Sequence, residues 1–180
     1  MKKQFTLGFI GCGDIATDLA RVIGMTPGVR IGSCADPDGA RRAAFARRFV
    51  VKAFYNTAEE LMEKERPDAL FVGIPHHLHY PVVMDALGRG HNVLCEKPLA
   101  IVMEQARGMV DTARGKNLKL AVNYQYRYDR NAHALIMLCR EGLLGDISHC
   151  RVNMPWHRGP EYFASGAWRS RKAEAGGGTL

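Results

Sequence analysis

The chain has 180 residues, of which 47% are hydrophobic, 24% charged and 8% aromatic, and this is the composition of an ordinary globular protein. It excludes a disordered tail, a collagen-like rod and a disulfide-rich miniprotein, and no apolar run approaches the roughly 20 residues of a membrane helix. The formal net charge of +7 is spread thinly, apart from a modestly basic C-terminal tail, without the clustered stripe of a nucleic-acid surface. We therefore expect no nucleic-acid partner and no membrane partner.

The cysteines and the N-terminal segment bear on cellular compartment. There are five cysteines and no C-x-x-C pair, so neither a disulfide framework nor a zinc ribbon is indicated. Small buried side chains in a reducing compartment are the better interpretation. The apolar run 5–12 follows two lysines, as in a signal peptide, but no small-residue cleavage site follows it. We interpret the run as a first strand and expect a cytoplasmic protein.

Apolar runs and amphipathic segments alternate over about 120 residues. The predicted strands are residues 5–10, 30–35, 51–54, 69–74, 92–95 and 118–122. The predicted helices are residues 14–24, a helix from an Asp38 cap to residue 49, a short helix in which Thr57 and Glu60 form a capping box, and residues 80–88 and 103–116. Nearly continuous apolar strands separated by helices indicate a parallel sheet covered on both faces. Residues 1–122 are therefore predicted to form one doubly wound α/β domain.

The pattern changes after residue 122. An aromatic connector precedes a predicted helix at 132–141 and an alternating strand at 147–154, and residues 155–180 are rich in Gly, Arg and Trp. One strand cannot form a sheet, so Trp156 and Trp168 have too little chain nearby to bury them. We interpret residues 123–180 as the incomplete start of an α+β second domain, and we expect a mobile or aggregation-prone segment from about residue 150.

A glycine-rich turn follows the first strand and opens the first helix. It fits the pattern G-x-G-x-x-G/A through Gly11, Cys12, Gly13, Asp14, Ile15 and Ala16. Such a turn lets amide groups at the helix start bind a pyrophosphate, and Asp36, at the end of the next strand, is placed to accept hydrogen bonds from a ribose. The pattern predicts a Rossmann dinucleotide site and favours NAD over NADP, although Arg41 and Arg42 could soften that preference.

Three histidines follow the fourth strand, in His76-His77-Leu78-His79. They lack the one-turn spacing of two metal ligands and have no Cys or carboxylate partner nearby, so we predict no metal site. Open α/β sheets bind ligands at the carboxyl ends of strands. His79 is therefore expected to cap the next helix or to line the cofactor cleft.

The fifth strand ends in Glu96, Lys97 and Pro98. In regular geometry Glu96 and Lys97 cannot both point into one cleft, because successive strand residues face opposite ways. On the ligand side, Lys97 could hydrogen-bond a substrate hydroxyl or lose its proton and act as a base. The alternative is a surface lysine beside a turn proline.

Together these residues resemble the Gfo/Idh/MocA oxidoreductase family. The resemblance covers the whole chain and includes further segments, which are Pro75 with His79, Arg127-Tyr128, Gly142-Leu143-Leu144-Gly145-Asp146-Ile147, Trp168-Arg169 and Gly176-Gly177-Gly178-Thr179-Leu180. It implies a Rossmann domain followed by an α+β domain that is often used for homo-oligomerisation. It also implies NAD(P)-dependent hydride transfer at a hydroxyl-bearing carbon of a small molecule, usually a sugar, a polyol or another carbohydrate-like compound.

The resemblance also implies roles for individual residues. Lys97 assists proton transfer or positions substrate, and Arg127 is expected to contact substrate. The residues expected to line the cofactor site, beyond the glycine turn and Asp36, are Ile74, Pro75, His76, His79, Glu96, Lys97, Asn123, Trp168 and Arg169.

Three features depart from the family pattern. Relatives often have Thr-Pro-Asn where this chain has Ile74, Pro75 and His76, and Arg130 stands where a proline is usual. Members normally continue past the triple glycine into a helix with an Asp-x-x-x-His pair, so we expect the substrate domain to be mostly absent here. The main hypothesis is a dehydrogenase or reductase. The alternatives are a non-catalytic dinucleotide-binding module or truncated remnant, and a nucleic-acid binder using the basic tail.

Overall fold

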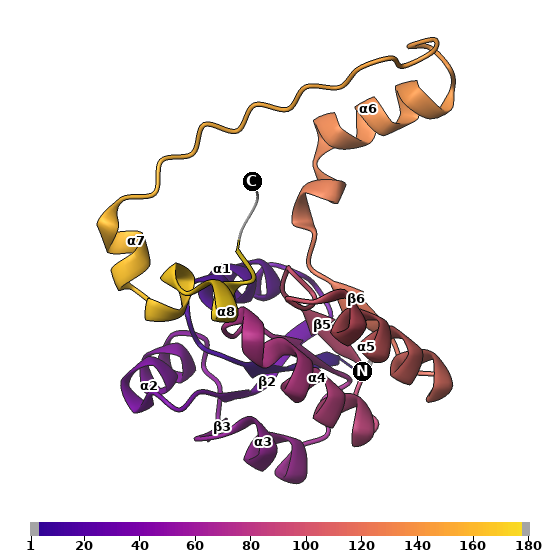
Figure 1. Cartoon of the computed structure of the whole chain (residues 1–180). Helices are drawn as coiled ribbons and strands as arrows, with labels where there is room; N and C mark the ends of the chain where they lie inside the picture. Colours follow the sequence, from indigo (N-terminus) through magenta and orange to yellow (C-terminus); the bar gives the residue numbers. More distant parts are fainter. Residues whose placement is uncertain (1–3, 178–180) are drawn as a thin grey trace. The chain divides into compact units, whose positions relative to one another are not determined.

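The computed structural model describes residues 4–177, which fall into two compact units. The first unit contains the chain up to Asn123 and takes it up again from Trp168 onward, and the second is Tyr124–Ala167 (Figure 1). The start of the second unit thus lies close to the predicted domain boundary. The sequence predicts that residues 168–177 belong to the second domain, whereas the structure groups them with the first unit.

A parallel sheet forms the centre of the first unit. Its strands are β1 (Phe5–Ile10), β2 (Val29–Ala35), β3 (Ala53–Tyr55), β4 (Ala69–Val72), β5 (Val93–Cys95) and β6 (Leu120–Val122). Every pair is parallel, and the order is β3-β2-β1-β4-β5-β6. The order reverses direction between β1 and β4, and at such a point doubly wound sheets open a ligand crevice at their carboxyl edge. The predicted doubly wound fold is confirmed.

Helices cover both faces of this sheet. They are α1 (Asp14–Gly24), α2 (Gly39–Arg48), α3 (Ala58–Lys64), α4 (His79–Gly88) and α5 (Met103–Gly115). Both predicted caps form, because the Asp38 side chain accepts hydrogen bonds from two amides of α2 and Thr57 accepts one from the Glu60 amide. The Glu60 carboxylate accepts a hydrogen bond from the Asn56 amide, whereas in a capping box it would accept one from the amide of the cap residue, Thr57.

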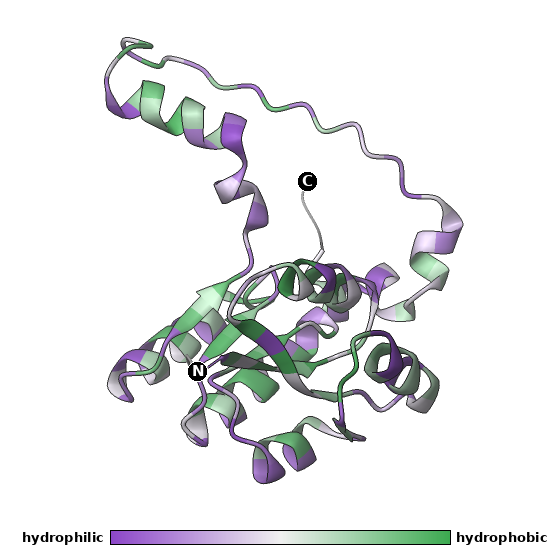
Figure 2. Cartoon of the chain, turned by 180° about the vertical axis from the view of Figure 1, so that it is seen from behind, coloured by the Kyte–Doolittle hydropathy of each residue, from purple (hydrophilic) through white to green (hydrophobic). Residues whose placement is uncertain are grey.

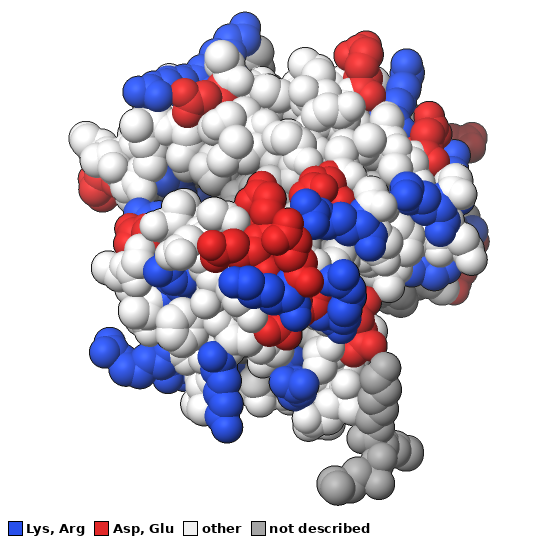
Figure 3. Space-filling view, turned by 90° about the horizontal axis from the view of Figure 1, so that it is seen from below, with Lys and Arg blue, Asp and Glu red and all other residues white. Residues whose placement is uncertain are grey.

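Side-chain alternation on the central strands divides the core into two layers. Phe9 and Phe71 lie on the face covered by α1 and α2, with their ring centroids 5.0 Å apart, while Leu70 and Val72 pack with α3, α4 and α5 on the other face. Figure 2 shows the hydrophobic colour concentrated in this region of the first unit. Figure 3 shows basic and acidic side chains interleaved on one face, without a continuous basic field there.

The second unit contains a single turn of 3-10 helix, η2 (Gln125–Tyr128), then α6 (Arg130–Arg140) and the short α7 (Pro160–Ala164). The predicted strand at 147–154 is wrong, because these residues are extended but form no ladder. A strand requires backbone partners, and none lies beside this segment in the described part of the chain. Val152, Met154 and Trp156 are exposed. The predicted mobility of this segment stays a prediction.

None of the helices described in residues 4–177 is long and apolar enough to cross a membrane.

The five cysteines should fall into two reactivity classes. Cys12, Cys34 and Cys95 are buried in the first unit, whereas Cys139 and Cys150 are exposed. A colorimetric thiol reagent should therefore modify two thiols of the native chain rapidly and three only after denaturant is added. Mass spectrometry of the partly labelled chain should locate the fast label on Cys139 and Cys150. Fast labelling of Cys34 or Cys95 would contradict the burial described here.

Candidate nucleotide-binding site

The turn between β1 and α1 is shaped by two glycines with different environments. Gly11 has a φ of +94°, and a Cβ at this residue would lie 2.3 Å from the Gly73 carbonyl oxygen at the end of β4. Gly13, in contrast, has no atom within 4 Å of the place where its Cβ would stand. Gly11 is therefore required by the fold, while Gly13 leaves open space at the start of the helix.

The first turn of α1 faces this open space. Gly13 is the N-cap and supplies no side-chain acceptor, and the first helical hydrogen bond runs from the Thr17 amide to the Gly13 carbonyl, 2.9 Å long. The preceding amides of the turn thus lack helical acceptors. Ala16 is fully buried against the sheet, as its small side chain allows, while Asp14 and Ile15 are exposed. Uncapped amides and a positive helix end suit an anionic ligand.

Asp36 is fixed beside the glycine turn. One carboxylate oxygen accepts a hydrogen bond from the Cys12 amide at 2.8 Å, and the other accepts from the Asp38 amide, also at 2.8 Å. The side chain is 9% exposed. The carboxylate therefore points toward the turn and not away from it, in the position from which it could meet a ribose next to a turn-bound phosphate. Arg41 pairs with Asp38, and the Arg42 guanidinium donates to the Asp36 backbone carbonyl.

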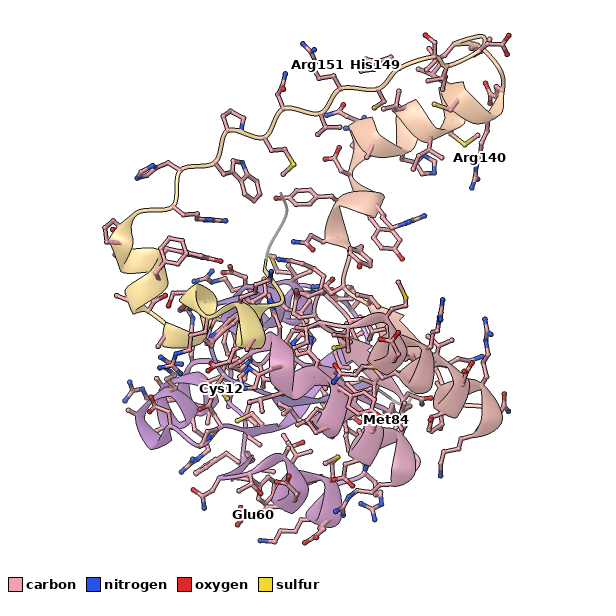
Figure 4. All side chains as sticks on the ribbon, viewed as in Figure 1. Cys12, Glu60, Met84, Arg140, His149 and Arg151 are labelled. Carbon is pink, nitrogen blue, oxygen red and sulfur yellow. The ribbon has the colours of Figure 1, made fainter. Side chains whose placement is uncertain are left out.

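Two thiols meet beneath the turn, a contact that sequence reasoning missed. The Cys12 thiol donates a hydrogen bond to the Ala35 carbonyl oxygen at 3.8 Å. The interaction with the Cys34 thiol and burial raise the pKa of Cys12, and the interaction with Cys12 lowers the pKa of Cys34 against the opposing effect of burial. Cys12 is labelled in Figure 4. The register that places Cys34 opposite Phe9 could have been inferred only once β1 and β2 were known to be neighbours.

The segment after β4 forms the next wall of the carboxyl edge. Ile74, Pro75 and His76 are half-buried, and η1 (His76–Leu78) leads directly into α4. His79, at the start of α4, is fully buried. Its Nδ1 lies 2.8 Å from the Pro98 carbonyl oxygen and its Nε2 lies 2.9 Å from that of Ile74. Both ring nitrogens thus face backbone carbonyl oxygens, and the neutral ring can donate to one of them at a time. That His79 lines the cofactor cleft stays a prediction.

Glu96 and Lys97 follow the end of β5 and differ in exposure. Glu96 is buried, and its carboxylate accepts hydrogen bonds from the Asn123 side-chain amide and from the Lys97 amide. Lys97 is exposed, and a cis peptide bond joins it to Pro98. The end of β5 thus holds one carboxylate inside, bound to the end of β6, and presents one lysine outward.

The remaining predicted residues belong to different units. Trp168 and Arg169 lie in the first unit, in the 3-10 turn η3 (Ala167–Ser170), and the Trp168 ring packs edge-on against His76. Arg127 is an exposed residue of the second unit. The first unit therefore gathers the predicted cofactor residues along its carboxyl edge, and Arg127 is not part of that group. Among residues 4–177, no three His, Cys, Asp or Glu side chains form a group suited to a metal ion.

Comparison with known proteins defines the class. Residues 5–124 match the family described as "Oxidoreductase family, NAD-binding Rossmann fold". The chain belongs to this family, Gfo/Idh/MocA. The glycine turn, the uncapped α1 and the fixed Asp36 carboxylate fit the NAD cofactor that the family description names.

The chain is similar to curated enzymes of about twice its length. It is 31% identical over 173 residues to 1,5-anhydro-D-fructose reductase of Ensifer adhaerens, covering 96% of this chain and 51% of the reductase. It is 28% identical over 162 residues to inositol 2-dehydrogenase of Corynebacterium glutamicum, covering 89% and 47%. The structure of the WlbA dehydrogenase from Bordetella pertussis, in complex with NADH and UDP-GlcNAcA, has the same fold, with a TM-score of 0.91 at 22% identity over 97% of this chain and 52% of that one.

The two glycines of the turn provide a matched pair for a stability test. Gly11→Ala should lower the free energy of unfolding by at least about 2 kcal/mol, because it combines a left-handed φ with a clash against backbone. Gly13→Ala should cost less than about 1 kcal/mol, because its φ is −77° and nothing stands near its Cβ. Urea denaturation measures both, and equal losses would contradict the geometry.

The two neighbouring histidines allow a similar comparison. His79→Ala removes a fully buried ring from two carbonyl oxygens and should cost about 2–4 kcal/mol. His77→Ala is the control, because the Nδ1 of His77 is buried without a hydrogen-bond partner, so removing this ring breaks no hydrogen bond at that atom and should change stability little. Thermal and urea unfolding of the two variants beside wild type would show the difference, and equal effects would contradict the buried contacts.

The same ring predicts an acid limit to stability. Burial is the largest influence on His79 and lowers its pKa, although the two carbonyl oxygens and Glu96 oppose it. A lowered folded pKa means that the unfolded chain takes up the proton first, so stability is lost as pH falls below the ordinary value of about 6.5. Unfolding free energy measured from pH 8 to pH 5 should decline more in wild type than in His79→Ala. Parallel curves would rule out this contribution.

Proposed function

We propose that this chain provides the nucleotide-binding part of an NAD-dependent oxidoreductase that acts on a hydroxyl-bearing carbon of a sugar, a polyol or a related compound. The observation that carries the proposal is the Asp36 carboxylate, held by the Cys12 amide at 2.8 Å beside an uncapped helix start. The named activities of the relatives, an anhydrofructose reductase and an inositol dehydrogenase, support the substrate class.

The cofactor's pyrophosphate would lie at the amides that open α1, in the space beside Gly13. Asp36 would accept hydrogen bonds from the adenosine ribose, and its negative charge would disfavour a 2′-phosphate, so NAD is preferred over NADP. Ile74, Pro75 and His76 would form the adjoining wall of the crevice. Bound NAD supplies the hydride acceptor or donor for the reaction.

The chain's own residues would manage the proton and the substrate hydroxyl. Lys97, exposed at the end of β5, would donate a hydrogen bond to the hydroxyl oxygen or, when deprotonated, take its proton. Glu96 and Asn123 hold one another beneath that position, so they would keep the Lys97 backbone in place. A substrate contact by Arg127 and self-association both stay predictions from the family.

Cofactor binding tests the proposal directly. Calorimetric titration with NADH should give a dissociation constant well below about 1 mM. A dissociation constant of 1 mM corresponds to a binding free energy of about −4 kcal/mol. Asp36→Asn keeps the shape of the side chain but loses its charge. It should weaken NADH binding about 10- to 100-fold and reduce the difference in affinity between NADH and NADPH. Asp18→Asn, an exposed change on α1, is the matched control. Wild type that binds no NADH at 1 mM would refute the proposal.

A lysine variant separates binding from turnover. Lys97→Ala should leave NADH affinity nearly unchanged and lower turnover at least about 100-fold, because the group that handles the hydroxyl proton is lost. The measurement is NADH absorbance with a panel of polyols and sugars that includes inositol, with Lys119→Ala, an exposed lysine before β6, as control. If Lys97→Ala turns over substrate at the wild-type rate, Lys97 does not handle the hydroxyl proton.

A further inference from the structure

His76 makes a contact that the proposed cofactor site does not explain. Its Nδ1 lies 2.9 Å from the carbonyl oxygen of Ala175, the last residue of the short helix α8 (Lys172–Ala175). Since a carbonyl can only accept, Nδ1 carries the hydrogen and donates it. A side chain at the carboxyl end of β4 is thereby tied to a segment that is almost one hundred residues later in the chain.

Aromatic packing strengthens the same connection. The centroid of the His76 ring lies 4.5 Å from that of Trp168 at an interplanar angle of 65°, and 5.6 Å from that of His79 on the other side. His79 is itself held by the Pro98 carbonyl. Three rings therefore connect the Lys97–Pro98 loop to Trp168, with His76 in the middle.

The end of the segment is also close-packed. Gly176 terminates α8 with a φ of +84°, and a Cβ there would stand 3.1 Å from the Cγ2 atom of Ile101. The backbone thus lies directly on the stretch that leads into α5. Two separate contacts, at His76 and at Ile101, hold the segment on the first unit.

We propose that His76 is a positioning residue, which holds residues 168–177 against the carboxyl edge of the sheet and thereby sets Trp168 and Arg169 beside the Lys97 loop. The inference rests on the proposed function, because it assigns those two residues to the cofactor end of the same crevice. An imidazole in this position reaches Ala175 and Trp168 together.

The charges around His76 favour its neutral form. Burial lowers its pKa most, and the positive charges of Lys97 and Arg169, with that of His79 once it is protonated, lower it further, against the opposing effect of the Ala175 carbonyl. A released His76 would return toward its ordinary pKa of about 6.5 and bind a proton more readily. The held state therefore loses stability as pH falls below about 6.5, and acid should loosen the segment.

Trp168 reports the position of the segment. The chain has two tryptophans, so Trp156→Phe leaves Trp168 as the single fluorophore. In this background we expect Trp168 to be protected from acrylamide and His76→Ala to raise its quenching constant at least about two-fold and to shift its emission to the red. His77→Ala should match the parent, and His76→Asn, which restores a donor but no ring, should lie between the two.

Acid gives a second measurement that does not depend on His76→Ala folding. Quenching of Trp168 should increase in the parent as pH falls from 7.5 to 5.5, and should increase less in His76→Asn, in which only the neighbouring His79 still titrates. Equal quenching in the parent, His76→Ala and His77→Ala would overturn the inference. So would an identical pH response in the parent and His76→Asn.

Calorimetry with NADH distinguishes failure of this inference from failure of the proposed function. His76→Ala should weaken NADH binding about 2- to 12-fold, the effect of losing one neutral hydrogen bond. If the parent binds NADH but Trp168 quenching is the same with and without the His76 side chain, the positioning role alone is overturned. If Trp168 quenching depends on His76 but the parent binds no NADH, the positioning role stands and the cofactor site is overturned.

Discussion

The site depends on how closely the ends of β1, β2 and β4 approach one another. Gly11 passes so near the Gly73 carbonyl that no side chain fits between them, and this approach brings the Cys12 amide to the Asp36 carboxylate. A carboxylate that accepts hydrogen bonds from two backbone amides at 2.8 Å has little freedom to turn away. The turn and the acidic residue, far apart in sequence, thus act as one rigid element, and the open space beside Gly13 lies next to it.

Much of this arrangement could be predicted from the sequence. Short apolar strands alternating with amphipathic helices define a parallel sheet, and the glycine spacing together with Asp36 locates its ligand edge. These features are local, because each depends on a few consecutive residues and on the fixed geometry of a strand–turn–helix unit. The caps formed by Asp38 and Thr57 are predictable for the same reason, since each depends on a side chain and an amide two or three residues away.

The features that could not be predicted depend on distant partners. Residues 147–154 alternate as a strand does, but alternation cannot supply the neighbour that a strand needs. The position of His79 in the sequence indicates only the carboxyl edge of the sheet. Its burial and its contacts with Ile74 and Pro98 come from the meeting of two separate loops. His76 and Ala175 are still further apart, and no local pattern indicates their contact.

The first unit is discontinuous in sequence, since the chain leaves it after Asn123 and returns at Trp168. Tyr124–Ala167 is in effect an insertion whose two ends are tethered to a finished scaffold. The entropy of closing such a loop grows only with the logarithm of its length, about 0.6 kcal/mol for each doubling. Residues could therefore be added to or removed from this segment at little thermodynamic cost to the sheet, so its length can vary while the glycine turn and the Asp36 carboxylate keep their geometry.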